Sequence, residues 1–390
     1  MNSSRNLISK GVKFFILIAL FISISSLKNT IVQEDLRINQ IQILTSHNSY
    51  RMKTDQILNY FQSIKHPLLK HFFSKPLDYS HTSFEEQFSV YGMRGLEIDI
   101  YHDPEGGLFY NRKGNKLIHQ NCESGIESLQ KPGLKVMHIP DFDYTSNHYT
   151  FIDALQTIKK WSEDNPSHLA LYIMVEAKEH HSMMLLKKKY CTKILKFTKN
   201  ALDSIDLEIK QVFGENSEKI ITPDKIRKEY KTLNQSILSN QWPTVSEARG
   251  RIIFILSASE TAKNLYLENH YSLKDRVMFV YSSPGNPETA FVKKDDPKEN
   301  FLLIQELVQQ GYMVRTRADA NTTEARKGDY SRFNKAINSG AQIIATDYYK
   351  ADIRNVTSKK WSNYFVQFPD KNIAKINSIN GSNGIQYIKQ

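Results

Sequence analysis

Apolar and polar residues alternate most clearly in the segment 95–103. Aliphatic residues at positions 96, 98 and 100 alternate there with Glu97, Asp99 and Tyr101. Successive side chains of a strand point to opposite faces, so the pattern predicts a β-strand with one apolar face and two carboxylates about 7 Å apart on the other. Two such carboxylates repel each other unless a cation lies between them. The segment therefore indicates a calcium or magnesium site, with a solvated acidic edge strand as the alternative.

Similar apolar runs recur along the chain and predict eight short strands. They cover residues 41–45, 96–101, 135–139, 169–176, 251–257, 276–282, 312–317 and 342–346. Helical periodicity lies between most of them, notably over residues 84–88, 151–161, 224–238, 296–309 and 323–338. Strands that alternate with helices are typical of an α/β protein with a TIM-type (β/α)8 barrel. We expect one catalytic barrel over residues 38–350, an extra helical excursion after the fourth strand within 177–249, and a tail or short extension over 351–390.

Polar side chains lie where the predicted strands end. They are His47 and Asn48, Glu97 and Asp99, His138, Glu176 and Lys178, Arg315 and Arg317, and Asp347. Catalytic groups of α/β barrels lie at the C-terminal ends of the strands, so these side chains are expected to converge on one face.

The overall charge adds a preference for anionic partners. The net charge is +11, which suits lipid headgroups or phosphorylated substrates. The basic residues are dispersed, and we find no basic–aromatic motif, so we expect no nucleic-acid partner. No obligate protein partner is evident either.

The N-terminal segment predicts the cellular location. Basic residues precede an apolar run over positions 14–24, which predicts a signal peptide or signal-anchor within residues 1–30. We therefore expect a secreted or periplasmic protein that associates peripherally with a membrane.

The polar residues predicted to converge suit phosphodiester chemistry. Asn48, Glu97, Asp99 and Glu176 offer the hard oxygen donors that calcium prefers. This leaves His47 and His138 as an acid–base pair, because imidazole titrates near neutral pH. The basic residues Lys178, Arg315 and Arg317 would then bind anionic groups of the substrate. As alternatives, Glu176 pairs only with Lys178, the two arginines pair with Asp319 or Glu324, and His138 is merely structural.

Four segments carry a resemblance to a known family. Residues 46–50 (Ser-His-Asn-Ser-Tyr), 95–99 (Gly-Leu-Glu-Ile-Asp), 136–138 (Val-Met-His) and 175–178 (Val-Glu-Ala-Lys) resemble the catalytic barrel of phosphoinositide-specific phospholipase C. Residues 311–320 and 339–348 resemble its calcium-dependent, secreted, single-domain branch.

The resemblance implies a distorted β/α barrel with calcium in the active site. Asn48, Glu97, Asp99 and Glu176 would be its ligands, and the inositol 2-hydroxyl would attack phosphorus to release diacylglycerol and a cyclic inositol phosphate. His138 would be the general acid. His47 would stabilise the phosphorane or share the role of base with a carboxylate. The substrate would be an inositol phospholipid at a membrane surface, with its headgroup preference left open.

Two other functions remain possible at this point. Glycerophosphodiester phosphodiesterases also combine a Glu-x-Asp strand, a cation and two histidines, but their first strand normally carries His-Arg-Gly, where this chain has His47-Asn48-Ser49. The second alternative is a barrel that binds lipid headgroups without turnover. The presence of both key histidines argues against it.

Overall fold

The computed structural model describes residues 36–53, 76–180, 188–381 and 387–389, so the predicted signal segment lies outside the described residues. The described strands are β1 (Ile41–Ser46), β2 (Gly95–Tyr101), β3 (Lys135–Val136), β4 (Leu171–Ala177), β5 (Ile252–Ser257), β6 (Phe279–Val280), β7 (Phe291–Lys293), β8 (Met313–Arg317), β9 (Ile343–Thr346), β10 (Ala374–Ile376) and β11 (Tyr387–Ile388). The described α-helices are α4 (Phe84–Ser89), α5 (Phe151–Asp164), α6 (Lys199–Phe213), α7 (Pro223–Arg227), α8 (Leu233–Leu238), α9 (Val245–Ala248), α10 (Glu260–Leu267), α11 (Phe301–Gln309), α12 (Thr323–Lys327) and α13 (Ser331–Asn338).

Eight parallel strands follow one another in chain order, in two sheets that meet at two seams. One sheet has the order β11-β10-β1-β9-β8-β7 and the other β3-β2-β4-β5-β6. A parallel bridge between Tyr281 and Phe291 joins the sheets beside β6 and β7. At the second seam, Arg94 N donates to Leu44 O at 2.8 Å, which sets β2 beside β1. The fold class is therefore that of a distorted (β/α)8 barrel, with sparse backbone pairing at the seams.

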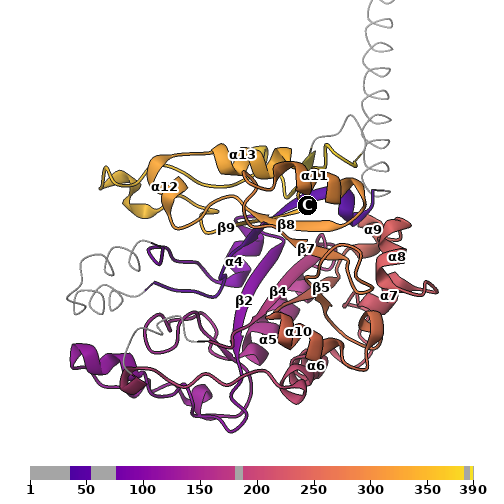
Figure 1. Ribbon diagram of the computed structural model, residues 1–390. Helices are drawn as coiled ribbons and strands as arrows, with labels where there is room; N and C mark the ends of the chain where they lie inside the picture. Colours follow the sequence, from indigo (N-terminus) through magenta and orange to yellow (C-terminus); the bar gives the residue numbers. More distant parts are fainter. Residues whose placement is uncertain (1–35, 54–75, 181–187, 382–386, 390) are drawn as a thin grey trace, which may run out of the picture.

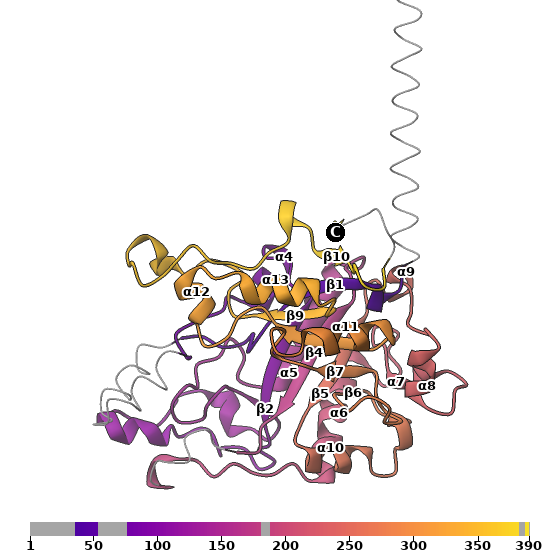
Figure 2. The same ribbon diagram turned by 45° about the horizontal axis from the view of Figure 1, so that its top comes forward.

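The strand β10 explains why the seam between β1 and β2 is open at one end. β10 pairs antiparallel with β1, with Ile41 opposite Ile376 and Ile43 opposite Ala374. Figure 2 shows β10 beside β1. Because β10 pairs with β1 over residues 41–43 and β9 takes the other edge over residues 43–46, β2 approaches β1 only beyond β10, at Leu44.

Two of the strand predictions need correction. The predicted third strand, residues 135–139, is only the two-residue β3, which pairs antiparallel with the end of β2 and is not a barrel strand. Its place among the eight parallel strands is taken by β7, which the sequence analysis did not predict. The other seven predicted strands correspond to β1, β2, β4, β5, β6, β8 and β9.

Three predicted helices are shorter or divided. The helix expected over 224–238 is split into α7 and α8, because Lys228 ends α7 with a positive φ of 51°. The helix expected over 323–338 is split at Gly328, where φ is +68°. The helix expected from residue 296 begins at Phe301, because Asp296 Oδ1 accepts hydrogen bonds from Lys298 N and Glu299 N in a preceding turn.

Helices cover the outside of the strands. In Figure 1, α11 and α13 lie over β8 and β9, while α5, α6 and α10 lie along the sheet formed by β2, β4 and β5. The apolar face of β2 (Leu96, Ile98 and Ile100) belongs to the same buried core as Phe151 and Leu155 of α5. The opposite face of β2 is thus left for the barrel interior.

The predicted excursion after β4 contributes α7, α8 and α9, which cover the N-terminal ends of the strands. The anchor is the buried Trp242, whose Nε1 donates to Gly311 O at 2.8 Å. Its ring also meets Phe291 edge-on, with 5.4 Å between the ring centroids. Gly311 precedes β8 and Phe291 begins β7, so the excursion closes the barrel at the end opposite the polar residues. Among the described residues, no helix is long and apolar enough to cross a membrane.

We predict that His168 makes the stability of the fold fall with decreasing pH. This side chain is fully buried, with Nε2 2.8 Å from Ser162 Oγ and Nδ1 2.7 Å from Leu169 O, and burial lowers its pKa to about 4. An unfolded chain protonates histidine near pH 6.5, so between these values the unfolded state binds more protons than the native state. From pH 7 to pH 4, His168 alone should lower the free energy of unfolding by up to roughly 3 kcal/mol.

Urea unfolding at several pH values checks this prediction. The variant His168→Gln should show a shallower loss of stability between pH 7 and pH 5 than the wild type. An equal loss in both proteins would contradict the role given to His168.

Candidate active site and metal centre

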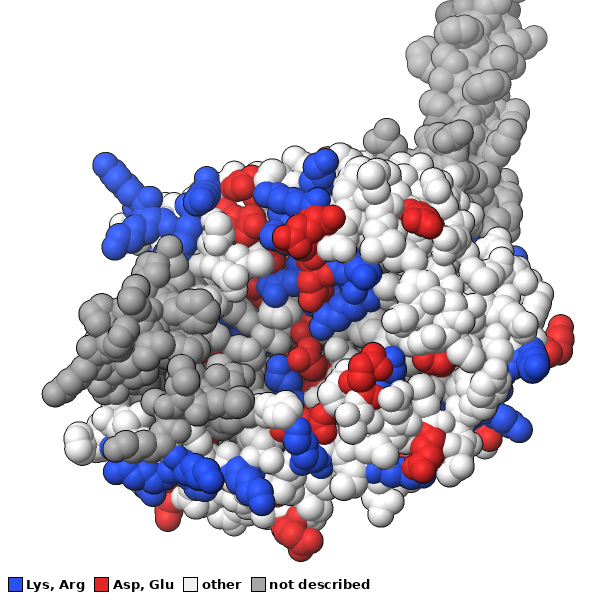
Figure 3. Space-filling model, viewed as in Figure 1, with Lys and Arg blue, Asp and Glu red and all other residues white. Residues whose placement is uncertain are grey.

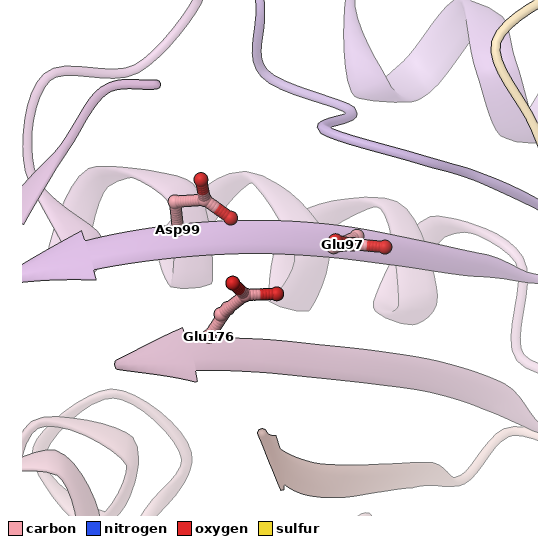
Figure 4. Close-up of side chains that lie close together, drawn as sticks. All are labelled: Glu97, Asp99 and Glu176. Carbon is pink, nitrogen blue, oxygen red and sulfur yellow. The ribbon is translucent and has the colours of Figure 1, made fainter. Parts of the chain in front are cut away.

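Three carboxylates lie together on two adjacent strands, Asp99 and Glu176 near their C-terminal ends and Glu97 two residues before Asp99. Glu97 and Asp99 come from β2 and Glu176 from β4, as Figure 4 shows. The parallel register places Asp99 directly opposite Glu176. One carboxylate oxygen from each of the three residues lies within 4.8 Å of the other two. The pairing of β2 with β4 therefore brings Glu176, which is distant in the sequence, beside Glu97 and Asp99.

This cluster fits a hard divalent cation. Asp99 is fully buried, and neither of its carboxylate oxygens accepts a hydrogen bond from the described residues. Buried carboxylates are normally paired, hydrogen-bonded or bound to a metal. Burial raises the pKa of Asp99, although Lys178 opposes that shift. Three carboxylates this close together supply the oxygen donors that calcium takes.

Asn48 lies in the turn after β1, directly before Ser49, whose backbone contacts Glu97. It has a positive φ of 48°, a conformation that asparagine tolerates better than most residues. Its Nδ2 donates to Tyr79 Oη at 2.9 Å, which leaves Oδ1 as the acceptor of the amide. The following residue, Ser49, donates its backbone N–H to Glu97 O at 2.9 Å. These bonds hold the turn after β1 against β2.

His47 is oriented by a carboxylate from the far end of the chain. Its Nδ1 lies 2.8 Å from Asp347 Oδ1, just after β9. The other Asp347 oxygen accepts a hydrogen bond from Arg317 at 2.8 Å. Burial would raise the pKa of Asp347, but His47 and Arg317 hold it well below its usual range. The other ring nitrogen, Nε2, lies 3.6 Å from Glu97 Oε1, so the imidazole borders the carboxylate cluster.

His138 is oriented in the same manner but is not placed by a barrel strand. It lies in the loop after β3, and Tyr101 Oη donates to its backbone oxygen at 2.8 Å. The imidazole Nδ1 lies 2.7 Å from Asp143 Oδ2. That carboxylate also accepts from Arg51 Nε at 2.6 Å, and both side chains are buried. The pKa of Asp143 is below the usual range, because the charges of Arg51 and His138 outweigh the effect of burial.

The predicted basic residues reach the site, and each of them pairs with an acid. Lys178 Nζ lies 2.9 Å from Glu176 Oε1 and 3.2 Å from Asp99 Oδ2. Arg315 donates to Glu97 Oε2 at 2.7 Å and also contacts Asp295. Arg317 pairs with Asp347. Both arginines thus form ion pairs, although not with the acids that the sequence analysis considered, Asp319 and Glu324.

The sequence analysis missed four residues of the site. They are Arg51, Asp143, Lys293 and Asp295. Lys293 Nζ lies 3.7 Å from Glu176 Oε2 and was missed together with its strand, β7. A signal for Asp143 was present, because an acid five residues after a histidine in a short loop can fold back onto its ring. On the face seen in Figure 3, acidic and basic side chains gather in the middle, which agrees with these mixed pairs.

The arrangement combines groups that can bind a cation with groups that can transfer protons. The carboxylate cluster can hold a cation, and each of two histidines has one ring nitrogen fixed by an aspartate and the other left for proton exchange. A phosphodiester placed between these groups would meet a metal, an acid and a base.

Comparison with known proteins places this geometry in a family. The family model for phosphoinositide phospholipase C, Ca²⁺-dependent, matches residues 36–378. A calcium-dependent phosphoinositol-specific phospholipase C from Pseudomonas sp., in its apo form, is similar in structure with a TM-score of 0.52 and 16% sequence identity, over 88% of this chain and 96% of that one. Its myo-inositol complex matches with a TM-score of 0.51 and the same identity and coverage. No curated protein sequence matches significantly.

We predict that Arg51 is essential for stability because it neutralises Asp143 inside the protein. Arg51 also donates to Leu77 O at 2.6 Å and stacks over the Tyr79 ring at 4.3 Å. Arg51→Met should lower the free energy of unfolding by roughly 3–5 kcal/mol, the cost of leaving a buried charge without its partner. Urea unfolding followed by circular dichroism measures this loss. The double variant Arg51→Met/Asp143→Asn should recover part of it, and a loss below about 1 kcal/mol for the single variant would disprove the assignment.

Proposed function

The chain belongs to the calcium-dependent phosphoinositide phospholipase C family, and we propose on this premise which of its residues carry the reaction. The protein is a phosphoinositide phospholipase C, a calcium-dependent phosphoric diester hydrolase that acts on inositol phospholipid. The family match does not favour the glycerophosphodiester phosphodiesterase or the non-catalytic barrel. The observation that carries our assignment of roles is that two aspartate-oriented histidines border the cluster of three carboxylates. His47 Nε2 lies 3.6 Å from Glu97, and His138 is close enough for its charge to lower the pKa of Asp99.

The residues proposed to hold calcium are Asn48, Glu97, Asp99 and Glu176. Their donors are one amide oxygen and carboxylate oxygens, and the buried Asp99 carboxylate, which accepts no hydrogen bond from the described residues and has only the Lys178 ammonium group near it, supports the fit. When bound, calcium lowers the pKa of the attacking hydroxyl and stabilises the negative charge that grows on the phosphoryl oxygens.

His138 is proposed as the general acid. The inositol 2-hydroxyl oxygen forms a bond to phosphorus, the bond from phosphorus to the glycerol oxygen breaks, and His138 gives its proton to that oxygen. Asp143 stabilises the imidazolium before this transfer, at a distance of 2.7 Å. The products are diacylglycerol and a cyclic inositol phosphate, which water can open when the histidine acts in reverse.

His47 is proposed to work at the 2-hydroxyl and the phosphoryl oxygens. Because its Nε2 lies beside Glu97, the proton of the 2-hydroxyl passes either to His47 or to that carboxylate. The Arg317 guanidinium, 3.4 Å from the same nitrogen, adds positive charge for the phosphoryl group. Arg315 is buried between Glu97 and Asp295, so we assign it to positioning Glu97. Lys178 remains for the anionic substrate.

We also propose that the enzyme works at a membrane surface outside the cytoplasm. The signal-like segment within residues 1–30 and the net charge of +11 support this location. Ile353 and Val356 support surface contact, because they are 86% and 83% exposed on a short 3₁₀ turn that follows β9 in the chain. Exposed aliphatic residues next to basic ones favour peripheral binding to a lipid surface.

The first test is phosphorus NMR of the purified protein with phosphatidylinositol micelles. With calcium, the spectrum should gain the resonance of a cyclic inositol phosphate, and a chelator should prevent its formation. Cleavage of glycerophosphoinositol to glycerol phosphate in its place would favour the phosphodiesterase. If neither substrate is cleaved, the remaining function would be a barrel that binds lipid headgroups without turnover.

The role of His138 predicts a dependence on the leaving group. His138→Ala should lower kcat on phosphatidylinositol by about 10²- to 10⁴-fold, the usual contribution of a general acid. An inositol phosphate ester of a nitrophenol needs no proton on its leaving oxygen, so the same variant should lose less than about tenfold on that substrate. The control is His270→Ala, because the half-buried His270 side chain hydrogen-bonds only Lys274 O among the described residues, through Nδ1. Equal losses on the two substrates would contradict the role of general acid.

A further inference from the structure

The Lys178 ammonium group lies inside the carboxylate cluster. Its Nζ is 2.9 Å from Glu176 and 3.2 Å from Asp99, two of the residues assigned to calcium. We propose that Lys178 occupies the calcium position between Asp99 and Glu176 in the metal-free protein, and that calcium binds only when this ammonium group leaves. This inference rests on the proposed function, because it concerns the regulation of the same site.

The strand register explains why the lysine reaches this position. Asp99 and Glu176 are direct partners across the parallel pair β2 and β4. Lys178 follows two residues after Glu176 and continues the ladder, since its backbone N–H donates to Ile100 O at 3.0 Å. Residues i and i+2 of an extended chain share a face, so Lys178 projects to the side of Glu176.

Calcium and the ammonium group cannot share these oxygens. Calcium binds carboxylate oxygens at about 2.3–2.6 Å, so an ion bound to both Asp99 and Glu176 would take the space that Nζ now occupies. Two cations at such a short separation in a poorly solvated site repel each other strongly. The lysine is therefore a competitor of the metal within the chain itself.

Lys178 is better able to move than the other cations that contact the cluster. Arg315 is held by both Glu97 and Asp295, and its side chain is only 2% exposed. Of the three carboxylates, Lys293 pairs only with Glu176, at 3.7 Å, and its Nζ also lies 3.5 Å from Ser257 Oγ. The Lys178 side chain is 22% exposed and has a flexible four-carbon stem, so it can swing out while its backbone stays in the ladder.

The displaced ammonium group needs a new anionic partner, and the phosphodiester of the substrate provides one. A phosphate that attracts the Lys178 ammonium group draws it away from the metal position, which calcium can then occupy. Conversely, a bound calcium ion displaces the ammonium group and so makes it available to the phosphate. The two ligands should therefore strengthen each other's binding, because coupling between two sites is reciprocal. Calcium alone should bind more weakly than calcium together with an inositol phosphate.

Isothermal titration of the full-length protein with calcium tests this proposal without turnover. Lys178→Met keeps the length of the side chain and removes its charge. In the absence of any substrate, this variant should bind calcium at least about fivefold more tightly than the wild type, the lower range of coupling between neighbouring sites. Addition of myo-inositol 1-phosphate should tighten calcium binding several-fold in the wild type and much less in Lys178→Met.

Lys294→Met is the matched control. It also removes one positive charge, from the residue next to Lys293, but no ion pair joins the Lys294 side chain to a described acid, so its calcium affinity should stay near that of the wild type. If Lys178→Met does not fold without metal, Lys178→Gln, whose amide can still donate to either carboxylate, replaces it.

The outcomes separate the inference from the function on which it rests. Equal calcium affinity in the wild type and both Lys178 variants would overturn the competition and leave the metal site intact. An equal gain in Lys294→Met would also overturn it, because the effect would then be general electrostatics. No calcium binding in any of the proteins would overturn the metal assignment together with the competition.

Discussion

The close approach of three carboxylates inside the barrel, two of them buried and Glu176 half-buried, is the constraint on which the site depends. Each carboxylate needs a positive partner, and the partners come from different strands. Arg315 of β8 pairs with Glu97, and Lys293 of β7 pairs with Glu176. These pairs join the sheet containing β2 and β4 to the sheet containing β7 and β8 through the interior. Charge compensation thus links the two halves where backbone pairing between them is sparse, so the electrostatics of the site also stabilise the shape of the barrel.

Each of the two histidine rings is oriented by an aspartate, but the two aspartates lie at very different distances along the chain. His138 takes its aspartate from five residues along the same loop, whereas His47 takes Asp347 from 300 residues away. The local pair depends on a buried arginine, Arg51, and the remote pair on a partly exposed one, Arg317. In both cases an aspartate shared with an arginine fixes one ring nitrogen. The reactive nitrogens are therefore set by packing that extends well beyond the metal.

Much of this arrangement was predictable from the sequence, for identifiable reasons. The alternation around Glu97 and Asp99 revealed β2, and the position of Glu176 at the end of an apolar run brought it to the same face. Strand β7 was missed because three residues are too few to show a period. Residues 135–139 looked like a barrel strand because an apolar run does not reveal whether its partner is parallel. The acids that pair with Arg315 and Arg317 depend on the barrel cross-section, which no local pattern encodes.

Strand β1 has consequences for how the chain reaches its native state. It is the first strand of the barrel, but both of its edges are completed by β9 and β10, from the last part of the described chain. Contacts of such large sequence separation form late and slowly. A ribosome must therefore release almost the whole polypeptide before the barrel can be sealed. If the chain is exported as proposed, this late closure would favour passage through a secretion channel, because an unsealed barrel is easier to keep unfolded.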